Sequence, residues 1–151
     1  MGSMAISVSA SAPPVPGVDL SGPHALVFYK VTCGVTKMAT PAIERLARAY
    51  PGLVVGVGQD PPADLEAFAS EFGLSFPQVP DLDPYAESDA YGILSAPTAI
   101  AVDGDGTVAA VAESWDRAAW NRLSSVLAGL VDRPAVEVSE PEDGLPDFKP
   151  G

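Results

Sequence analysis

The sequence predicts an α/β domain, because apolar runs of strand length alternate with segments of helical periodicity and a hairpin follows them. Residues 25–29 are a continuous apolar run, and residues 53–57 form a second run interrupted by one glycine. Such runs are typical of strands buried on both faces of a sheet. Residues 98–102 and 107–111 read as two more strands, joined by an Asp-Gly-Asp-Gly turn that favours a hairpin. The length of 151 residues suits one domain with a sizeable core.

Three segments carry apolar side chains at helical spacing, residues 38–50, 61–73 and 115–130. A Pro-Gly pair ends the first segment, two prolines open the second, and a glycine closes the second. The third helix is expected to begin at Trp115 or Asp116 and to end the domain. Two strand-helix units are thus followed by a hairpin and a closing helix.

The chain divides into an N-terminal extension, residues 1–21, a domain, residues 22–130, and a C-terminal tail. The extension is rich in Pro and Ser, and it has one short candidate strand at residues 6–9. Residues 1–3 look like the remnant of an expression tag.

The tail, residues 131–151, is acidic and interrupted by prolines, so little of it is expected to be buried. We expect it to be mobile or held only by extended contacts, with Phe148 as its one candidate docking aromatic. Within the domain, residues 74–90 are loop-like, with a weak strand at residues 78–79.

Composition excludes several classes of partner. The net charge is −12, so a polyanion such as nucleic acid or an anionic membrane surface is repelled at long range. No run approaches the roughly 18–20 apolar residues of a membrane span. Residues 1–24 have neither the basic nor the continuous apolar region of a signal peptide.

Cys33 is the only cysteine, and it stands where the strand at residues 25–29 gives way to the first helix. The free N–H groups and the positive dipole end of a helix stabilise a thiolate over a thiol. Thr36 stands where a dithiol site would carry its second sulfur. A free cysteine also commonly packs as a small buried hydrophobe, so position alone leaves both a reactive and an inert thiol open.

Residues 33–37, Cys-Gly-Val-Thr-Lys, resemble the C-x-x-C-K segment of thioredoxins with the second cysteine replaced, and Pro41 stands where those proteins bend the active-site helix. Residues 91–98, ending in Ala-Pro-Thr, are similar to the stretch that carries the family's cis-proline. Residues 59–90 resemble the insertion of the TlpA-like and redoxin branch. The chain therefore resembles the thioredoxin-like superfamily over residues 22–130. The resemblance implies a thioredoxin-like fold with a central mixed β-sheet flanked by helices.

The resemblance also assigns roles around the thiol. It implies that Pro97 is cis and that the Ala96 backbone faces Cys33, ready to pair with an extended substrate. Thr36 can donate a hydrogen bond to the thiolate but cannot resolve a mixed disulfide. The implied catalytic residues are Cys33, Thr36 and Pro97, and the implied substrate-binding residues are Thr32, Gly34, Val35 and Ala96.

Two positions depart from the family pattern. Val27 replaces a buried carboxylate that accepts a proton, and Thr32 replaces an aromatic residue. Lys30 and Lys37 can add positive potential near the thiol. The site is thus predicted to hold one nucleophile with altered surroundings.

These residues favour monothiol thiol–disulfide exchange with a disulfide- or thiol-bearing protein or a low-molecular-weight thiol. A one-cysteine peroxidase, which would oxidise Cys33 to a sulfenate, is an alternative, although its P-x-x-x-T-x-x-C pattern is missing. A non-catalytic binding module using the cis-proline groove is another. Residues 33–36 also resemble the C-G-F-S of monothiol glutaredoxins, which hold an iron–sulfur cluster with glutathione.

No cofactor or metal is expected. His24 has no partner histidine or cysteine in sequence for a zinc or haem site. Residues 56–61 match half of a dinucleotide fingerprint, because Pro61 replaces the third glycine. Neither nucleic acid nor membrane is an expected partner. The expected location is the cytoplasm, with an exported form left open because TlpA-like proteins often have a leader that is removed.

Overall fold

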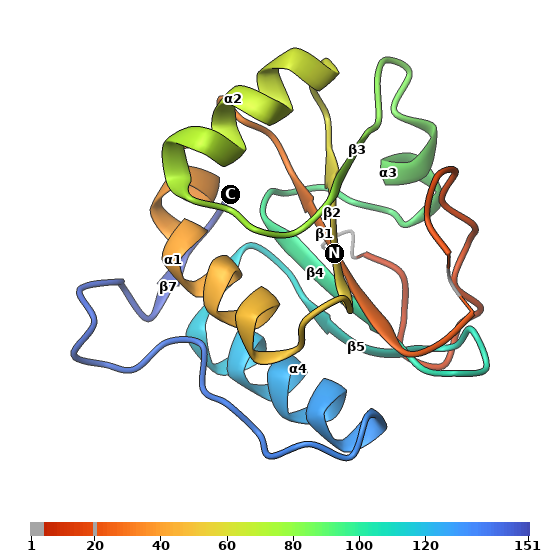
Figure 1. Cartoon of the computed structure of the whole chain (residues 1–151), viewed down its shortest axis with the longest axis vertical. Helices are drawn as coiled ribbons and strands as arrows, with labels where there is room; N and C mark the ends of the chain where they lie inside the picture. The colour runs from red at the N-terminus through yellow and green to blue at the C-terminus, as the bar shows by residue number, and fades with distance from the viewer. Residues whose placement is uncertain (1–4, 20) are drawn as a thin grey trace.

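The computed structural model describes residues 5–19 and 21–151, and the predicted tag remnant at residues 1–3 lies outside them. A five-stranded mixed sheet forms its centre, in the order β3-β2-β1-β4-β5 (Figure 1). The strands are β1 (His24–Tyr29), β2 (Val54–Gly58), β3 (Gln78–Pro80), β4 (Thr98–Val102) and β5 (Val108–Ala112). The helices are α1 (Gly34–Ala49), α2 (Pro62–Phe72), α3 (Ala86–Ala90) and α4 (Arg117–Leu130). The predicted α/β class is confirmed.

The register of the central strand brings three chain segments to one edge of the sheet. β1 pairs in parallel with β2, and their last residues, Tyr29 and Gly58, lie opposite each other. β4 runs antiparallel to β1, so its first residue, Thr98, lies opposite Phe28. The loops that follow β1 and β2 and the loop that precedes β4 therefore meet at the same edge.

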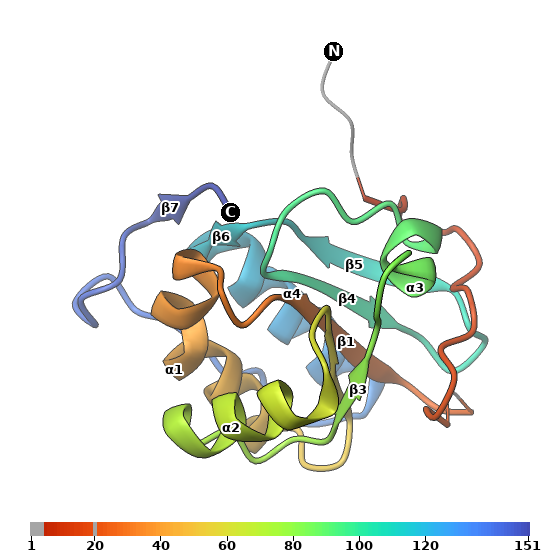
Figure 2. The same cartoon turned by 90° about the horizontal axis from the view of Figure 1, so that it is seen from above.

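Each face of the sheet is covered by a different set of elements (Figure 2). Alternate residues of β1 point to opposite faces. Ala25 and Val27 pack with buried side chains of α1, α2 and α4, whereas Leu26 and Phe28 pack with Tyr91 and the N-terminal segment. Both faces of β1 are therefore buried, as its continuous apolar sequence predicts.

Three predicted boundaries need correction. The candidate strand at residues 6–9 is not formed. This segment instead lies alongside β5, where the Ser9 N–H donates to the Val108 carbonyl at 2.8 Å. Residues 74–90 contain α3 in addition to the weak strand, now β3. The closing helix begins at Arg117, because Asp116 is its N-cap and accepts from the Ala119 N–H.

The C-terminal segment, residues 131–151, lies against the domain, and most of its residues are exposed, as its acidic and proline-rich sequence predicts. Val138 and Ser139 are 0% and 1% exposed, whereas Phe148, the expected docking aromatic, is 57% exposed. The segment is held on the domain mainly by polar contacts, which leave no periodic apolar pattern in the sequence.

Arg117 is the centre of those contacts. Its side chain is buried and donates to the Ser139 hydroxyl at 3.0 Å, to the Leu145 carbonyl at 2.6 Å and to the Asp147 carboxylate. The Asp143 carboxylate lies 3.5 Å from the same guanidinium. Arg117, at the start of α4, thus holds residues 139–147 of the C-terminal segment against the domain.

Acid is expected to weaken this attachment. Hydrogen bonds from the Ser139 hydroxyl and the Leu145 N–H, together with Arg117, lower the pKa of Asp143 to about 2. Because that value lies below the roughly 3.9 of an unfolded aspartate, the carboxylate stabilises the fold above pH ~4 and loses this contribution as the pH falls towards ~2. The free energy of unfolding should therefore fall more steeply with acid in the parent protein than in Asp143→Asn. If the free energy of unfolding falls equally steeply with acid in both proteins, the Asp143 carboxylate does not contribute in this way.

Among the described residues, no helix is long and apolar enough to cross a membrane.

Candidate functional site

Cys33 lies at the end of the loop that leads from β1 into α1. It is the N-cap of α1, and its side chain makes no capping hydrogen bond, which leaves the sulfur free to face outwards from the helix start. The loop is closed by the Cys33 N–H, which donates to the Lys30 carbonyl at 3.0 Å. The Val31 N–H donates to the Asp60 carboxylate at 2.9 Å, so the loop after β2 also supports the loop that carries the thiol.

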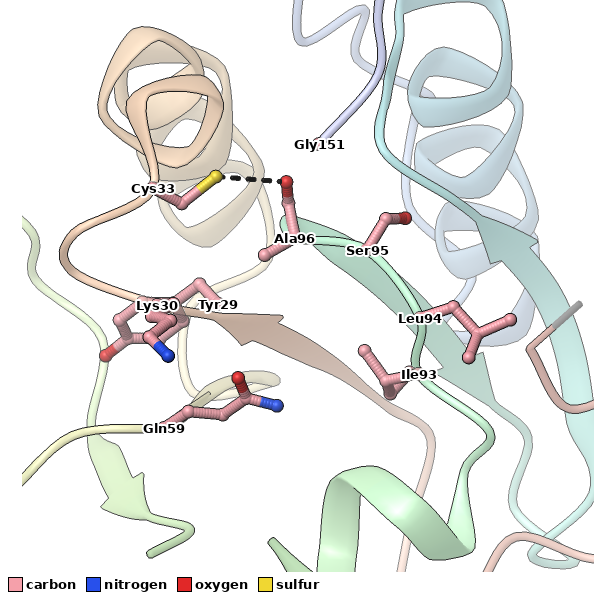
Figure 3. Close-up of a pocket in the computed structure, with 9 residues that line it drawn as sticks. All are labelled: Tyr29, Lys30, Cys33, Gln59, Ile93, Leu94, Ser95, Ala96 and Gly151. Carbon is pink, nitrogen blue, oxygen red and sulfur yellow. Dashed lines mark hydrogen bonds between the residues drawn. The ribbon is translucent and has the colours of Figure 1, made fainter. Parts of the chain in front are cut away.

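The loop before β4 faces the thiol across the sheet edge. The Ala96–Pro97 peptide bond is cis, and the Cys33 Sγ–H donates to the Ala96 carbonyl at 3.4 Å (Figure 3). The Thr98 hydroxyl donates to the Ser95 carbonyl at 2.9 Å, and the Ser114 hydroxyl donates to that of Ser95 at 2.8 Å. Cys33 and Ala96, which are 63 positions apart in the chain, are therefore in contact.

A pocket of about 270 Å³ opens beside the sulfur. Its lining comes from the three loops at the sheet edge and from the last residue of the chain, namely Tyr29, Lys30, Cys33, Gln59, Ile93, Leu94, Ser95, Ala96 and Gly151. Lys30 is the one cation in this lining, and its Nζ lies 5.9 Å from the centre of the Tyr85 ring. Burial and the nearby Asp60 carboxylate raise the pKa of Tyr29, so its hydroxyl stays protonated. The pocket is small and mixed in polarity.

Thr36 lies in the first turn of α1 and is 1% exposed. Its hydroxyl has no hydrogen-bond partner among the described residues. A buried hydroxyl without an acceptor costs free energy. A thiolate accepts hydrogen bonds better than a protonated thiol does. The Thr36 hydroxyl is therefore a buried donor whose hydrogen bond is unused.

The other sequence-predicted residues take different positions. Pro97 is buried behind Ala96, and Ala96 lines the pocket. Thr32 and Gly34 are exposed beside Cys33, and Val35 is half-buried; none of these three lines the pocket. A Cβ on Gly34 would meet no atom within 4 Å, so the surface beside the thiol is open.

Sequence reasoning missed the contributions of Gln59, Asp60 and Gly151. The first two follow β2 directly, and the ends of neighbouring parallel strands meet at one edge, so their position beside the β1–α1 loop was predictable from the strand order. Gly151 carries no comparable signal. Among the described residues there is no group of three or more His, Cys, Asp or Glu side chains that could hold a metal ion.

No model of a known protein family matches the chain, and no curated protein matches it.

Solved structures do match it. The thioredoxin domain of a thiol-disulfide oxidoreductase from Bacteroides vulgatus has a TM-score of 0.65 and 20% identity, covering 85% of this chain and 97% of that one. Mycobacterium tuberculosis dsbF has a TM-score of 0.61 and 23% identity, covering 73% and 81%. A secreted disulfide oxidoreductase from M. tuberculosis, homologous to Escherichia coli DsbE, has a TM-score of 0.59 and 22% identity, covering 73% and 83%.

The element order, the mixed sheet and these three matches agree with one another. The chain has the thioredoxin-like fold.

Proposed function

We propose that the protein performs monothiol thiol–disulfide exchange through Cys33. The observation that carries the proposal is the contact between the Cys33 sulfur at the N-cap of α1 and the Ala96 carbonyl of the cis-proline loop. A helix start favours a thiolate, and an extended loop opposite it offers backbone groups to a substrate strand. Structural neighbours named as thiol-disulfide oxidoreductases support the same chemistry.

The reaction has two exchange steps. The Cys33 proton leaves to solvent, and the thiolate attacks one sulfur of a substrate disulfide, forming a mixed disulfide and releasing the other sulfur as a thiolate. An external thiol then attacks the mixed disulfide at the substrate sulfur, and Cys33 departs as the thiolate. The substrate now carries a disulfide with the external thiol, and a second thiol must attack this disulfide to reduce the substrate fully.

The neighbouring residues serve these steps in distinct ways. The Thr36 hydroxyl offers the thiolate a hydrogen bond from the buried side. When the Cys33 proton leaves, the Ala96 carbonyl loses its donor and becomes free to accept an N–H from the substrate backbone. Lys30 contributes positive potential from the pocket wall.

Two alternatives use the same residues. A one-cysteine peroxidase would give a sulfenate on Cys33 after exposure to hydrogen peroxide, which a sulfenate-trapping reagent detects. A non-catalytic module would bind protein through the cis-proline loop, and Cys33→Ser would then keep full binding and full cellular function. Exchange predicts that Cys33→Ser is inactive.

The partner proposed for the second step is a low-molecular-weight thiol or a thioredoxin-type reductant. A cytoplasmic location would supply such thiols, because that compartment is kept reducing. One structural neighbour is a secreted oxidoreductase, so an exported form stays an alternative.

A peptide with an internal disulfide tests the proposed function. We expect one equivalent of mixed disulfide on Cys33, seen by mass spectrometry, and turnover that increases with the concentration of added reduced glutathione. Cys33→Ser should form no adduct. Turnover with glutathione that is as fast in Cys33→Ser as in the parent would contradict exchange through Cys33.

A further inference from the structure

The last residues of the chain run across the front of the thiol site. β7 (Phe148–Lys149) pairs antiparallel with β6 (Trp115–Asp116), and this pairing carries the chain from the Arg117 contacts back over the domain (Figure 2). Two upstream bonds fix its start, because the Arg117 N–H donates to the Asp147 carbonyl at 2.9 Å and the Trp115 indole donates to the Pro146 carbonyl at 2.7 Å. We call residues 148–151 the strap.

The strap ends on the cis-proline loop. Gly151 lines the same pocket as Cys33 and lies beside Ala96, and its N–H reaches the Ser114 hydroxyl at 3.3 Å (Figure 3). A Cβ at position 151 would stand 2.9 Å from the Ala96 nitrogen and closer still to the Ala96 carbonyl oxygen. The backbone of residue 151 is thus in direct contact with the backbone that an extended substrate would use.

The strap has no buried residue like those that anchor the chain before it. Its residues are exposed, including Phe148 at 57%, whereas Val138 and Ser139 upstream are fully buried. Segments with few buried contacts open locally at low free energy. The strap can therefore leave the loop while residues 131–147 stay attached through Arg117.

We propose that the strap determines substrate specificity at Cys33: it excludes extended peptide disulfides until it is displaced, and it leaves the pocket beside the sulfur open to small disulfides. The proposal rests on the proposed exchange function of Cys33. Its structural basis is that the strap covers the Ala96 backbone, whereas the roughly 270 Å³ pocket remains open with the strap in place. When a tethered segment competes with a peptide, the apparent affinity for the peptide is the intrinsic affinity multiplied by the fraction of molecules in which the loop is free.

Gly151→Ala in the chain of residues 1–151 tests this, because the added methyl group cannot fit against Ala96. Gly129→Ala is the matched control, since a Cβ there meets no atom within 4 Å. Two probes release the same chromophore: 5,5′-dithiobis(2-nitrobenzoate), and an extended peptide of about ten residues whose cysteine carries a thionitrobenzoate disulfide. In each case the Cys33 thiolate forms a new disulfide and thionitrobenzoate leaves.

For Gly151→Ala we expect the rate with the peptide to rise about tenfold and the rate with the small probe to change less than about twofold. Gly129→Ala should leave both rates unchanged. Peptide rates that are equal in Gly151→Ala and the parent would overturn the proposal, and so would an equal rise with both probes, which indicates a general shield. If neither probe reacts with any folded variant, the exchange function itself fails.

Discussion

Replacing Thr36 with cysteine is expected to shorten the lifetime of the Cys33 mixed disulfide by about two or more orders of magnitude. Residue 36 lies in the first turn of α1, three positions after Cys33, where helix side chains are neighbours. A second thiol there attacks at an effective concentration of millimolar or higher, without diffusion. It would release the substrate and leave an internal disulfide between Cys33 and the introduced thiol. Mass spectrometry of the decaying glutathione adduct, with no free thiol present, measures the lifetime.

Thr40→Cys is the matched control for this experiment. Thr40 is also buried on α1, but it stands seven positions from Cys33 and its hydroxyl bonds the Lys37 carbonyl. A thiol there adds the same group without reaching the adduct, so the lifetime should match that of the parent. A Thr36→Cys adduct that is as long-lived as the parent's would mean that position 36 does not face the sulfur.

Arg117→Ala is expected to lower the free energy of unfolding by about 3–5 kcal/mol. Arg117 is 7% exposed, and its guanidinium donates to the Ser139 hydroxyl, the Leu145 carbonyl and the Asp147 carboxylate. Its removal leaves these acceptors without their donor and frees residues 131–151. Chemical denaturation with urea measures the change.

Arg122→Ala serves as the control, because Arg122 lies on the same helix and is exposed. This substitution should change the free energy of unfolding by no more than about 0.5 kcal/mol. Equal effects of the two substitutions would mean that the C-terminal segment adds little to stability, as the sequence alone suggested.

The central elements of the fold were predictable because each has a local signal. Residues 25–29 are apolar without interruption because both faces of β1 are covered, and Gly73, which takes the left-handed conformation, ends α2 where the sequence placed its stop. The short helix α3 lacks such a signal, because only Ser88 among its five residues is buried. Local patterns therefore identified the elements with a broad buried face.

The site was predictable in part. The strand-to-helix junction identified Cys33, and the family resemblance brought Ala96 and Pro97 to it across the sheet. The attachment of residues 131–151 depends on hydrogen bonds from Arg117 to residues 22–30 positions later, and the contact of Gly151 with Ala96 is between backbones. Contacts of both kinds leave the side-chain pattern unchanged, so the sequence did not reveal them.

The most direct test of the account compares the reaction of Cys33 with oxidised glutathione in the folded protein and in the urea-denatured chain at the same pH. We expect the folded protein to react faster, because only the folded chain places Cys33 at the start of a helix, beside an open pocket. A single adduct on Cys33, absent from Cys33→Ser, would accompany the faster rate. If the denatured chain forms the adduct and the folded protein does not, Cys33 is an inert core thiol and the proposed exchange is wrong.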